Sequence, residues 1–95
     1  MMYIRVKWIH TIPSEPVWIY SELDSSRWEL RKVEVYADGK MGFADQDKSV
    51  GGSSLSIEPL PSVAEIKVDP RFEPVEIAKE EFEAVWDAAI LKHRN

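Results

Sequence analysis

The sequence predicts an α+β domain: a meander of four or five antiparallel strands, with a C-terminal amphipathic helix packed on one face and a short helix near residues 63–68. Two β-rich runs flank Asp38-Gly39, which is a strong hairpin signal. Alternating runs precede this hairpin, and a helical apolar stripe ends the chain. With 95 residues, 44% of them hydrophobic, we expect residues 1–95 to form a single domain around one core.

Alternation of apolar and polar residues predicts the first two strands. Tyr3–His10 places apolar side chains at every second position and two basic residues between them, as expected of a half-buried strand. Thr11–Pro16 holds two prolines and is predicted to be a turn. Val17–Leu23 follows as the second strand, and its Trp18 and Tyr20 lie on the face opposite its aliphatic residues.

The third strand, which begins at residue 27, contains a break in its alternation. Trp28 and Leu30 place the apolar face on even positions, whereas Val33 and Val35 place it on odd positions. A strand with a side-chain period of two needs one extra residue to make this change. The sequence therefore predicts a β-bulge near Arg31-Lys32.

The hairpin loop can be chosen by matching side chains across the two strands. A two-residue loop would place an acidic residue opposite Phe43. A three-residue loop over 37–39 places Val33 opposite Phe43 and Val35 opposite Met41, so that apolar residues face apolar residues. We therefore expect the three-residue loop, with its glycine in the left-handed conformation.

The second half of the chain contains shorter elements. Gln46–Ser54 is polar and is predicted to be a loop, and Leu55–Glu58 is a possible edge strand that two prolines then end. A serine at 62, followed three residues later by a glutamate, forms a capping box and predicts the short helix over 63–68. Pro74–Ile77 is expected to be briefly extended.

The last element is a helix over residues 79–93, with acidic side chains in its first turns and basic ones near its end, as its dipole favours. Its apolar stripe should lie on the hairpin residues Val33, Val35, Met41 and Phe43. Three of the four tryptophans, at positions 8, 28 and 86, fit core stripes of this arrangement. The stripe consists of Phe82, Val85, Trp86, Ala89 and Ile90.

The formal net charge is −5, and the excess lies in the second half: residues 1–40 carry six acidic and six basic side chains, and residues 41–95 carry eleven and six. A nucleic-acid-binding surface needs clustered basic residues, so we expect no nucleic-acid partner. An acidic surface favours a basic protein partner through electrostatic complementarity. The same charge could equally serve solubility alone.

The sequence lacks the features that are typical of secreted, membrane or metal-binding proteins. The chain has no Cys, which excludes disulfides and thiolate ligands. The first residues lack the features of a signal peptide, and no apolar run reaches the about 18–20 residues that cross a bilayer. We therefore expect a cytoplasmic protein that has no membrane partner, no cofactor and no metal.

Catalytic candidates are few. His10, beside the proline-rich turn, is the better of the two histidines and could act as a base with a nearby carboxylate. A hydrogen bond within the turn is the simpler role for it. His93 is expected to be a solvated residue at the helix end. The segment that contains Asp45 and Asp47 does not have the ligand spacing of a calcium loop.

Aromatic and acidic side chains are the candidates for partner contacts, because tyrosine and tryptophan are favoured anchors of protein interfaces. The alternative for the two aromatic residues of the second strand is that a second layer covers them. The candidate partner-binding residues are Trp18, Tyr20, Glu22, Asp24, Asp45 and Asp47.

The chain resembles a family of small bacterial proteins described as a domain of unknown function. The resemblance rests on YIRVKWIH, EPVWIYSELD, RWELRKVEVYADGKMGFAD, IEPLPSVAEI and FEPVEIAKEEFEAVW, and it covers almost the whole chain. At Ala78 the sequence lacks the serine expected as a helix N-cap, a loss of about 1 kcal/mol. Similar proteins are found among the immunity proteins proposed for bacterial toxin systems, and the resemblance implies no catalytic residues.

The sequence thus leads to a non-enzymatic protein-binding domain, an immunity protein that neutralises a cognate basic toxin by occluding its active site. An adaptor or structural interaction module is one alternative, and a small enzyme or ligand binder that uses His10 is the other. We expect a monomer or a weak homodimer.

Overall fold

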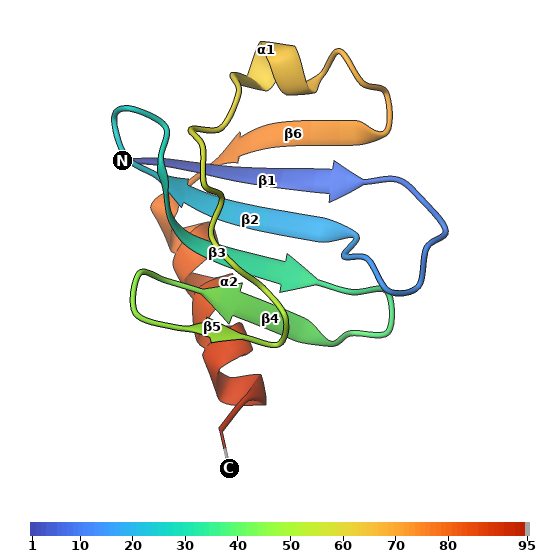
Figure 1. Cartoon of the computed structure of the whole chain (residues 1–95), viewed down its shortest axis with the longest axis vertical. Helices are drawn as coiled ribbons and strands as arrows, with labels where there is room; N and C mark the ends of the chain where they lie inside the picture. The colour runs from blue at the N-terminus through green and yellow to red at the C-terminus, as the bar shows by residue number, and fades with distance from the viewer. Residues whose placement is uncertain (95) are drawn as a thin grey trace.

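The computed structural model describes residues 1–94 and contains one antiparallel sheet of six strands with helical segments on both of its faces (Figure 1). The elements are β1 (Met2–Trp8), β2 (Trp18–Leu23), β3 (Glu29–Val35), β4 (Met41–Ala44), β5 (Ser49–Val50), α1 (Val63–Ile66), β6 (Phe72–Ile77) and α2 (Lys79–Lys92). The strand order is β5-β4-β3-β2-β1-β6, so that β1 to β5 form a meander and β6 joins the free side of β1.

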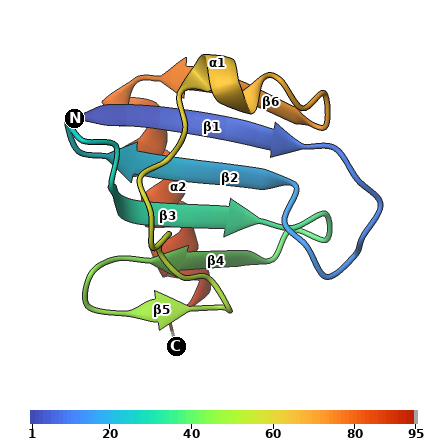
Figure 2. The same ribbon diagram turned by 45° about the horizontal axis from the view of Figure 1, so that its top comes forward.

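The chain crosses the sheet twice, once on each face. After β5, at one edge, residues 51–62 cross in front of the sheet to α1 and to β6 at the opposite edge (Figure 1). We call residues 51–62 the strap, and the face that they cross the strap face. Helix α2 then crosses back behind the sheet, on the face that we call the α2 face (Figure 2).

The predicted fold class is confirmed, and the sheet has more strands than the four or five expected. The predicted extended segment 74–77 belongs to β6, where an edge position tolerates a proline. The possible edge strand over 55–58 does not form, because this segment lies in the strap. Both helices form as predicted, and α1 begins with the expected capping box of Ser62 and Glu65.

The hairpin between β3 and β4 has the predicted three-residue loop. The Tyr36 N–H donates to the Lys40 carbonyl at 2.9 Å, and Gly39 adopts a φ of 89°, which is left-handed. The register pairs Val35 with Met41, and the next apolar pair of the two strands also matches the prediction. Matching of apolar side chains was therefore sufficient to choose the loop.

The third strand contains a bulge, one residue before the predicted position. Glu22 pairs with Arg31 but Leu23 pairs with Glu29, which leaves Leu30 as the extra residue. The bulge changes which face each side chain occupies. It directs Arg31 to the α2 face and Glu29 to the strap face.

The main core lies between α2 and the hairpin, as predicted. Phe82 is fully buried and Trp86 is 8% exposed, and both pack with the four expected hairpin residues. The ring centroids of Phe43 and Trp86 are 5.2 Å apart in an edge-on contact, which is a favoured aromatic geometry. Val85 is partly buried against the same cluster.

A second, smaller core lies on the strap face. Ile4, Val6 and Leu23 are buried there under α1 and the strap. Two strands, β1 and β2, therefore carry apolar residues on both faces. The prediction that Trp28 belongs to the core is wrong, because this residue lies just after the β2–β3 turn and is 43% exposed. Trp8 is half-buried.

Candidate functional site

The two aromatic residues predicted to contact a partner lie on the α2 face. Trp18 and Tyr20 pair with residues of β3 that pack under α2. Tyr20 packs against the main core, as in the alternative that a second layer covers it. The Trp18 ring lies within 5.3 Å of the Arg5 guanidinium carbon and 5.8 Å of the Lys7 ammonium. Cation–π contacts of this kind hold the ring against the sheet.

The predicted contact residue Glu22 is buried in an ion network. Both of its carboxylate oxygens accept hydrogen bonds from Arg31 at 2.8 Å, and Arg31 also donates to Glu83 of α2. The guanidinium carbon lies 4.9 Å from the centre of the Phe82 ring. Hydrogen bonding to Arg31 lowers the pKa of Glu22 and that of Glu83, against the opposing effect of burial. Arg31 therefore joins α2 to the sheet, and Glu22, its partner within the sheet, has little accessible surface.

The three remaining predicted residues lie in turns at one end of the sheet (Figure 1). An oxygen of Asp24 accepts from two backbone N–H groups of the β2–β3 turn, and an oxygen of Asp45 accepts from those of Asp47 and Lys48. Such bonds are typical of aspartate in turns. The structure therefore does not gather the six predicted residues into one surface.

Both histidines are engaged by the backbone. The His10 ring contacts the Pro16 carbonyl at 2.7 Å and accepts from the Ile12 N–H at 2.9 Å, so both ring nitrogens serve the β1–β2 turn. The His93 Nε2 bonds to the Met41 carbonyl of β4. A general base needs a free nitrogen within reach of its substrate, and His10 does not offer one.

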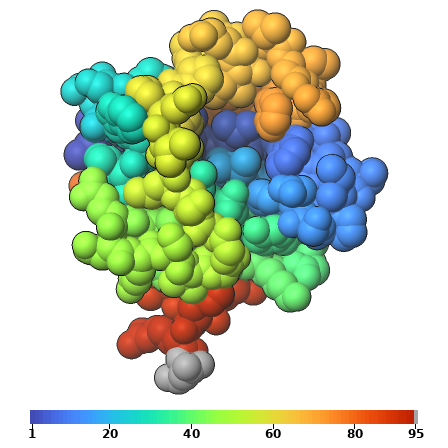
Figure 3. Space-filling view, in the orientation of Figure 1, coloured from blue at the N-terminus to red at the C-terminus, as the bar shows by residue number. Residues whose placement is uncertain are grey.

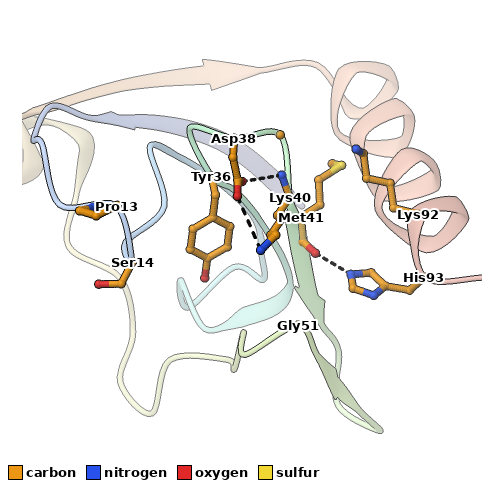
Figure 4. A pocket seen from close by; sticks show the side chains of 10 residues that line it. Pro13, Ser14, Tyr36, Asp38, Lys40, Met41, Gly51, Lys92 and His93 are labelled. Atoms are coloured by element: carbon orange, nitrogen blue, oxygen red, sulfur yellow. Dashed lines mark hydrogen bonds and ion pairs between the residues drawn. The ribbon is translucent and has the colours of Figure 1, made fainter.

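A cleft of about 470 Å³ with a mixed polar and apolar lining, the hairpin cleft, lies between the β1–β2 turn, the β3–β4 loop and the end of α2. Figure 4 shows His93 turned toward Met41, and Lys40 beside Asp38. The Lys40 side chain is 84% exposed, and its nitrogen lies 3.7 Å from the Asp38 carboxylate. Lys40 is therefore largely exposed and already lies near a carboxylate, and Lys92 is the other lysine that lines the cleft.

A second hollow lies on the strap face, between the strap, α1 and the strands β1, β2 and β6. We call it the α1 groove. Its volume is about 380 Å³, and Figure 3 shows it as the opening beside the strap with β1 at its floor. Its walls are mostly apolar, and the floor strands hold them in place. The apolar lining consists of Val6, Ile19, Leu60, Pro61, Ile66 and Phe72.

Polar groups at the bottom of the α1 groove are fully bonded. Glu29, with a side chain 1% exposed, accepts from the Ser21 hydroxyl at 2.6 Å and from the Ser56 N–H at 2.8 Å. The Lys32 ammonium lies 3.2 Å from the same carboxylate. A buried carboxylate needs such partners to offset its loss of hydration. Among the side chains that the structure describes, no buried nitrogen or oxygen lacks a partner.

The strap takes its position from side chains of β3. The Ser53 hydroxyl donates to Glu34 at 2.6 Å, and Lys32 donates to the Ser54 carbonyl at 3.0 Å. The bulge matters here, because it places Glu29 on the same face as these two residues. One strand thus anchors the loop that forms a wall of the α1 groove.

Arg27, two residues before β3, anchors the far end of the strap. Its guanidinium donates to the carbonyls of Leu60 and Pro61, and its own carbonyl accepts from the Leu60 N–H at 2.9 Å. Its φ is 66°, a left-handed conformation that disfavours residues other than glycine. The strap contacts offset this strain.

Sequence reasoning missed the α1 groove, although it found some of its parts. The apolar face of β1 and the capping box before α1 were both predicted. The signals that could have pointed to the groove are the acidic residue between Trp28 and Leu30 and the two prolines of the strap. Both signals indicate a groove only when the strap is known to cross β3.

Within residues 1–94, no three histidine, aspartate or glutamate side chains lie close enough together to hold a metal ion. In the same part of the chain, neither helix has the length and apolarity of a membrane span.

A family model described as a domain of unknown function, DUF6881, matches residues 2–91 of the chain. The match spans all six strands and all but the last residue of α2. No curated protein and no solved structure matches the chain.

Proposed function

The chain belongs to the DUF6881 family of domains of unknown function, and from the geometry of its surface we propose that it is a non-enzymatic protein-binding domain. The observation that carries the proposal is the α1 groove, an open and mostly apolar hollow on rigid strands. Exposed apolar concavities of this kind are typical of binding sites.

The bonding at the bottom of the groove favours a protein partner over a small molecule. Small-molecule sites usually orient their ligand with a few free polar groups. Here Ser21, Glu29 and Lys32 already bond to one another or to the strap. A ligand would therefore gain little beyond apolar contact, which a side chain of a partner supplies equally well while the rest of that partner covers the rim.

The finer proposal is that the domain is an immunity protein, which neutralises a basic bacterial toxin in the cytoplasm by occluding its active site. The formal net charge of −5 supports a basic partner. The resemblance to immunity proteins proposed for bacterial toxin systems supports the toxin as that partner. Occlusion needs no reactive group on this chain, in keeping with the backbone bonds of both His10 ring nitrogens.

An adaptor that binds through a sheet edge has less support. One edge strand, β5, has only two residues. The other, β6, contains Pro74, which lacks the N–H that an added strand would use. Both edges are therefore poor templates for strand addition, and the groove is the better candidate.

The test is coexpression of the chain with the product of the adjacent gene, followed by affinity purification of the pair. We expect a stable complex at micromolar concentration, and restored growth of cells in which the neighbouring protein alone is toxic. A purified pair that does not associate at micromolar concentration would overturn the binding proposal. A complex that leaves toxicity unchanged would overturn only the immunity function.

A further inference from the structure

We propose that the α1 groove is the docking site for a partner segment that inserts one large apolar side chain and places a lysine or arginine against Glu65. This inference rests on the proposed binding function and deepens it by assigning the chemistry of the bound segment. The two parts of the segment correspond to two features of the groove, its apolar bottom and its acidic rim.

The apolar side chain of the proposed segment is inferred from the incomplete cover of the second core. Val6 is 7% exposed, whereas Ile19 and Phe72, its neighbours in the groove, are only partly buried. On the opposite face, the fourteen-residue helix α2 covers the main core with its apolar stripe. On the strap face, the four-residue α1 leaves part of the apolar floor open. A large apolar side chain would complete this cover and remove that area from water.

The basic residue of the proposed segment is inferred from the charged side chains that line the groove. Three carboxylates line the groove, at positions 29, 65 and 69. Glu29 is paired with Lys32, and Asp69 is paired with Arg71 at 2.7 Å. Within residues 1–94, Glu65 takes part in no ion pair, and one of its oxygens accepts from the backbone N–H of Ser62. Its other oxygen has no hydrogen-bond partner among these residues, and Arg27 attracts the carboxylate only from beyond ion-pair distance, so a cation beside the inserted side chain could form a direct pair with Glu65.

Complementarity of the whole surface acts in the same direction. The net charge of −5 attracts a basic segment before contact, while Glu65 acts at short range beside Ile66 of the apolar wall. An acidic segment with the same apolar side chain would be repelled at both stages. The occupant is therefore defined by an apolar residue flanked by basic residues.

Three short peptides in one glycine-serine frame test this assignment: Lys-Trp-Lys, Glu-Trp-Glu and Lys-Ala-Lys, each titrated into the isotope-labelled full chain and followed by NMR. We expect Lys-Trp-Lys to shift the amide signals of Val6, Ile19 and Phe72 and to bind at least about tenfold more tightly than either other peptide. Equal binding of Lys-Trp-Lys and Glu-Trp-Glu, shifts confined to the hairpin cleft, or no shifts at all would overturn the inference.

Two variants separate the apolar and cationic contributions. Ile19→Lys places a long side chain in the groove, with its ammonium extended to the mouth of the groove. This variant should abolish Lys-Trp-Lys binding. Val75→Lys, at a residue of β6 that is 45% exposed, is the matched control. Glu65→Gln keeps the capping box, since glutamine also serves at that position, and should remove the preference for Lys-Trp-Lys over Glu-Trp-Glu. Glu80→Gln, on an exposed residue of α2, should leave this preference intact.

The complex with the neighbouring gene product distinguishes this inference from the function on which it rests. If wild type forms the complex and Ile19→Lys forms it equally well, the groove assignment is wrong and the binding function stands. If wild type forms no complex, the binding function itself is wrong. Should Ile19→Lys fail to fold, as its NMR spectrum would reveal, Glu65→Gln decides the question.

Discussion

The two faces of the sheet are covered by segments of very different kinds. On the α2 face, a regular helix presents a continuous apolar stripe, and Arg31 ties it to the sheet through carboxylates of β2 and α2. On the strap face, an irregular loop and one turn of helix cover the sheet, held by hydrogen bonds from β3. The first cover buries Phe82 and Trp86 in the main core, whereas the second leaves the α1 groove open.

The difference indicates which face of the sheet contributes most to stability and which face is available for binding. The α2 face removes aromatic side chains from water, and burial of this kind is the dominant stabilising term in folding. The strap face uses polar bonds, each of which contributes less in net terms but fixes the position of a loop. We therefore expect changes on the α2 face to affect unfolding most, and changes on the strap face to alter binding.

The largest effect should come from Arg31→Ala, which breaks the tie on the α2 face. It leaves Glu22 buried without its partner and removes the cation from the Phe82 ring. We expect a loss of about 2–4 kcal/mol in unfolding free energy, less than for a fully buried pair because 21% of the Arg31 side chain is exposed. Urea denaturation measures it. Arg5→Ala, which breaks the more exposed pair with Glu81, should cost less than about 1 kcal/mol, and equal losses would contradict the comparison.

Acid should weaken the same tie. Hydrogen bonds from Arg31 lower the folded-state pKa of Glu22 and Glu83 below the ordinary value of about 4.3. Both carboxylates therefore stabilise the fold fully above that value, and their contribution is lost as the pH falls through the lower folded-state pKa. Urea denaturation at a series of pH values should show stability falling below about pH 4, and in Arg31→Ala this fall should be smaller. An unchanged fall in the variant would assign the acid sensitivity to other groups.

A smaller effect is expected on the strap face from Gly42→Ala. A Cβ on Gly42 would lie 2.3 Å from the Ser53 hydroxyl and 3.0 Å from the Gly51 carbonyl oxygen, so the strap must shift. We expect a cost of about 1–3 kcal/mol, typical of overpacking, measured by thermal unfolding. In a Ser53→Ala background the added cost of Gly42→Ala should be smaller, since the closest contact is gone. An equal cost in both backgrounds would mean that the strap does not cause it.

The smallest effect should be a gain from Ala78→Ser. Ala78 is the N-cap of α2 and makes no side-chain hydrogen bond there. Its backbone is already extended, so a serine hydroxyl could accept from a free N–H of the first turn. We expect about 1 kcal/mol of added stability, seen as a higher urea midpoint with an unchanged slope. Ala78→Val, which supplies no acceptor, should give no gain.

The candidate site was less predictable than the fold, and particular residues show why. Trp18 and Tyr20 were judged from alternation alone, which separates two faces but does not say which one α2 covers. Glu22 looked like a surface charge until the bulge brought Arg31 beside it. Ile19 was predicted on an apolar face, yet its role in the groove depends on α1 and the strap.

Local features of the chain were determined by its sequence. The three-residue hairpin loop, the capping box at Ser62 and the apolar stripe of α2 each follow from side chains within one or two turns or strands of one another. The tertiary structure alone decided that β6 joins β1, that the strap crosses β3, and that a groove remains beside α1. The physical reason is separation along the chain: the bond between Arg27 and the Leu60 carbonyl joins residues 33 positions apart, and no periodicity encodes such a partner.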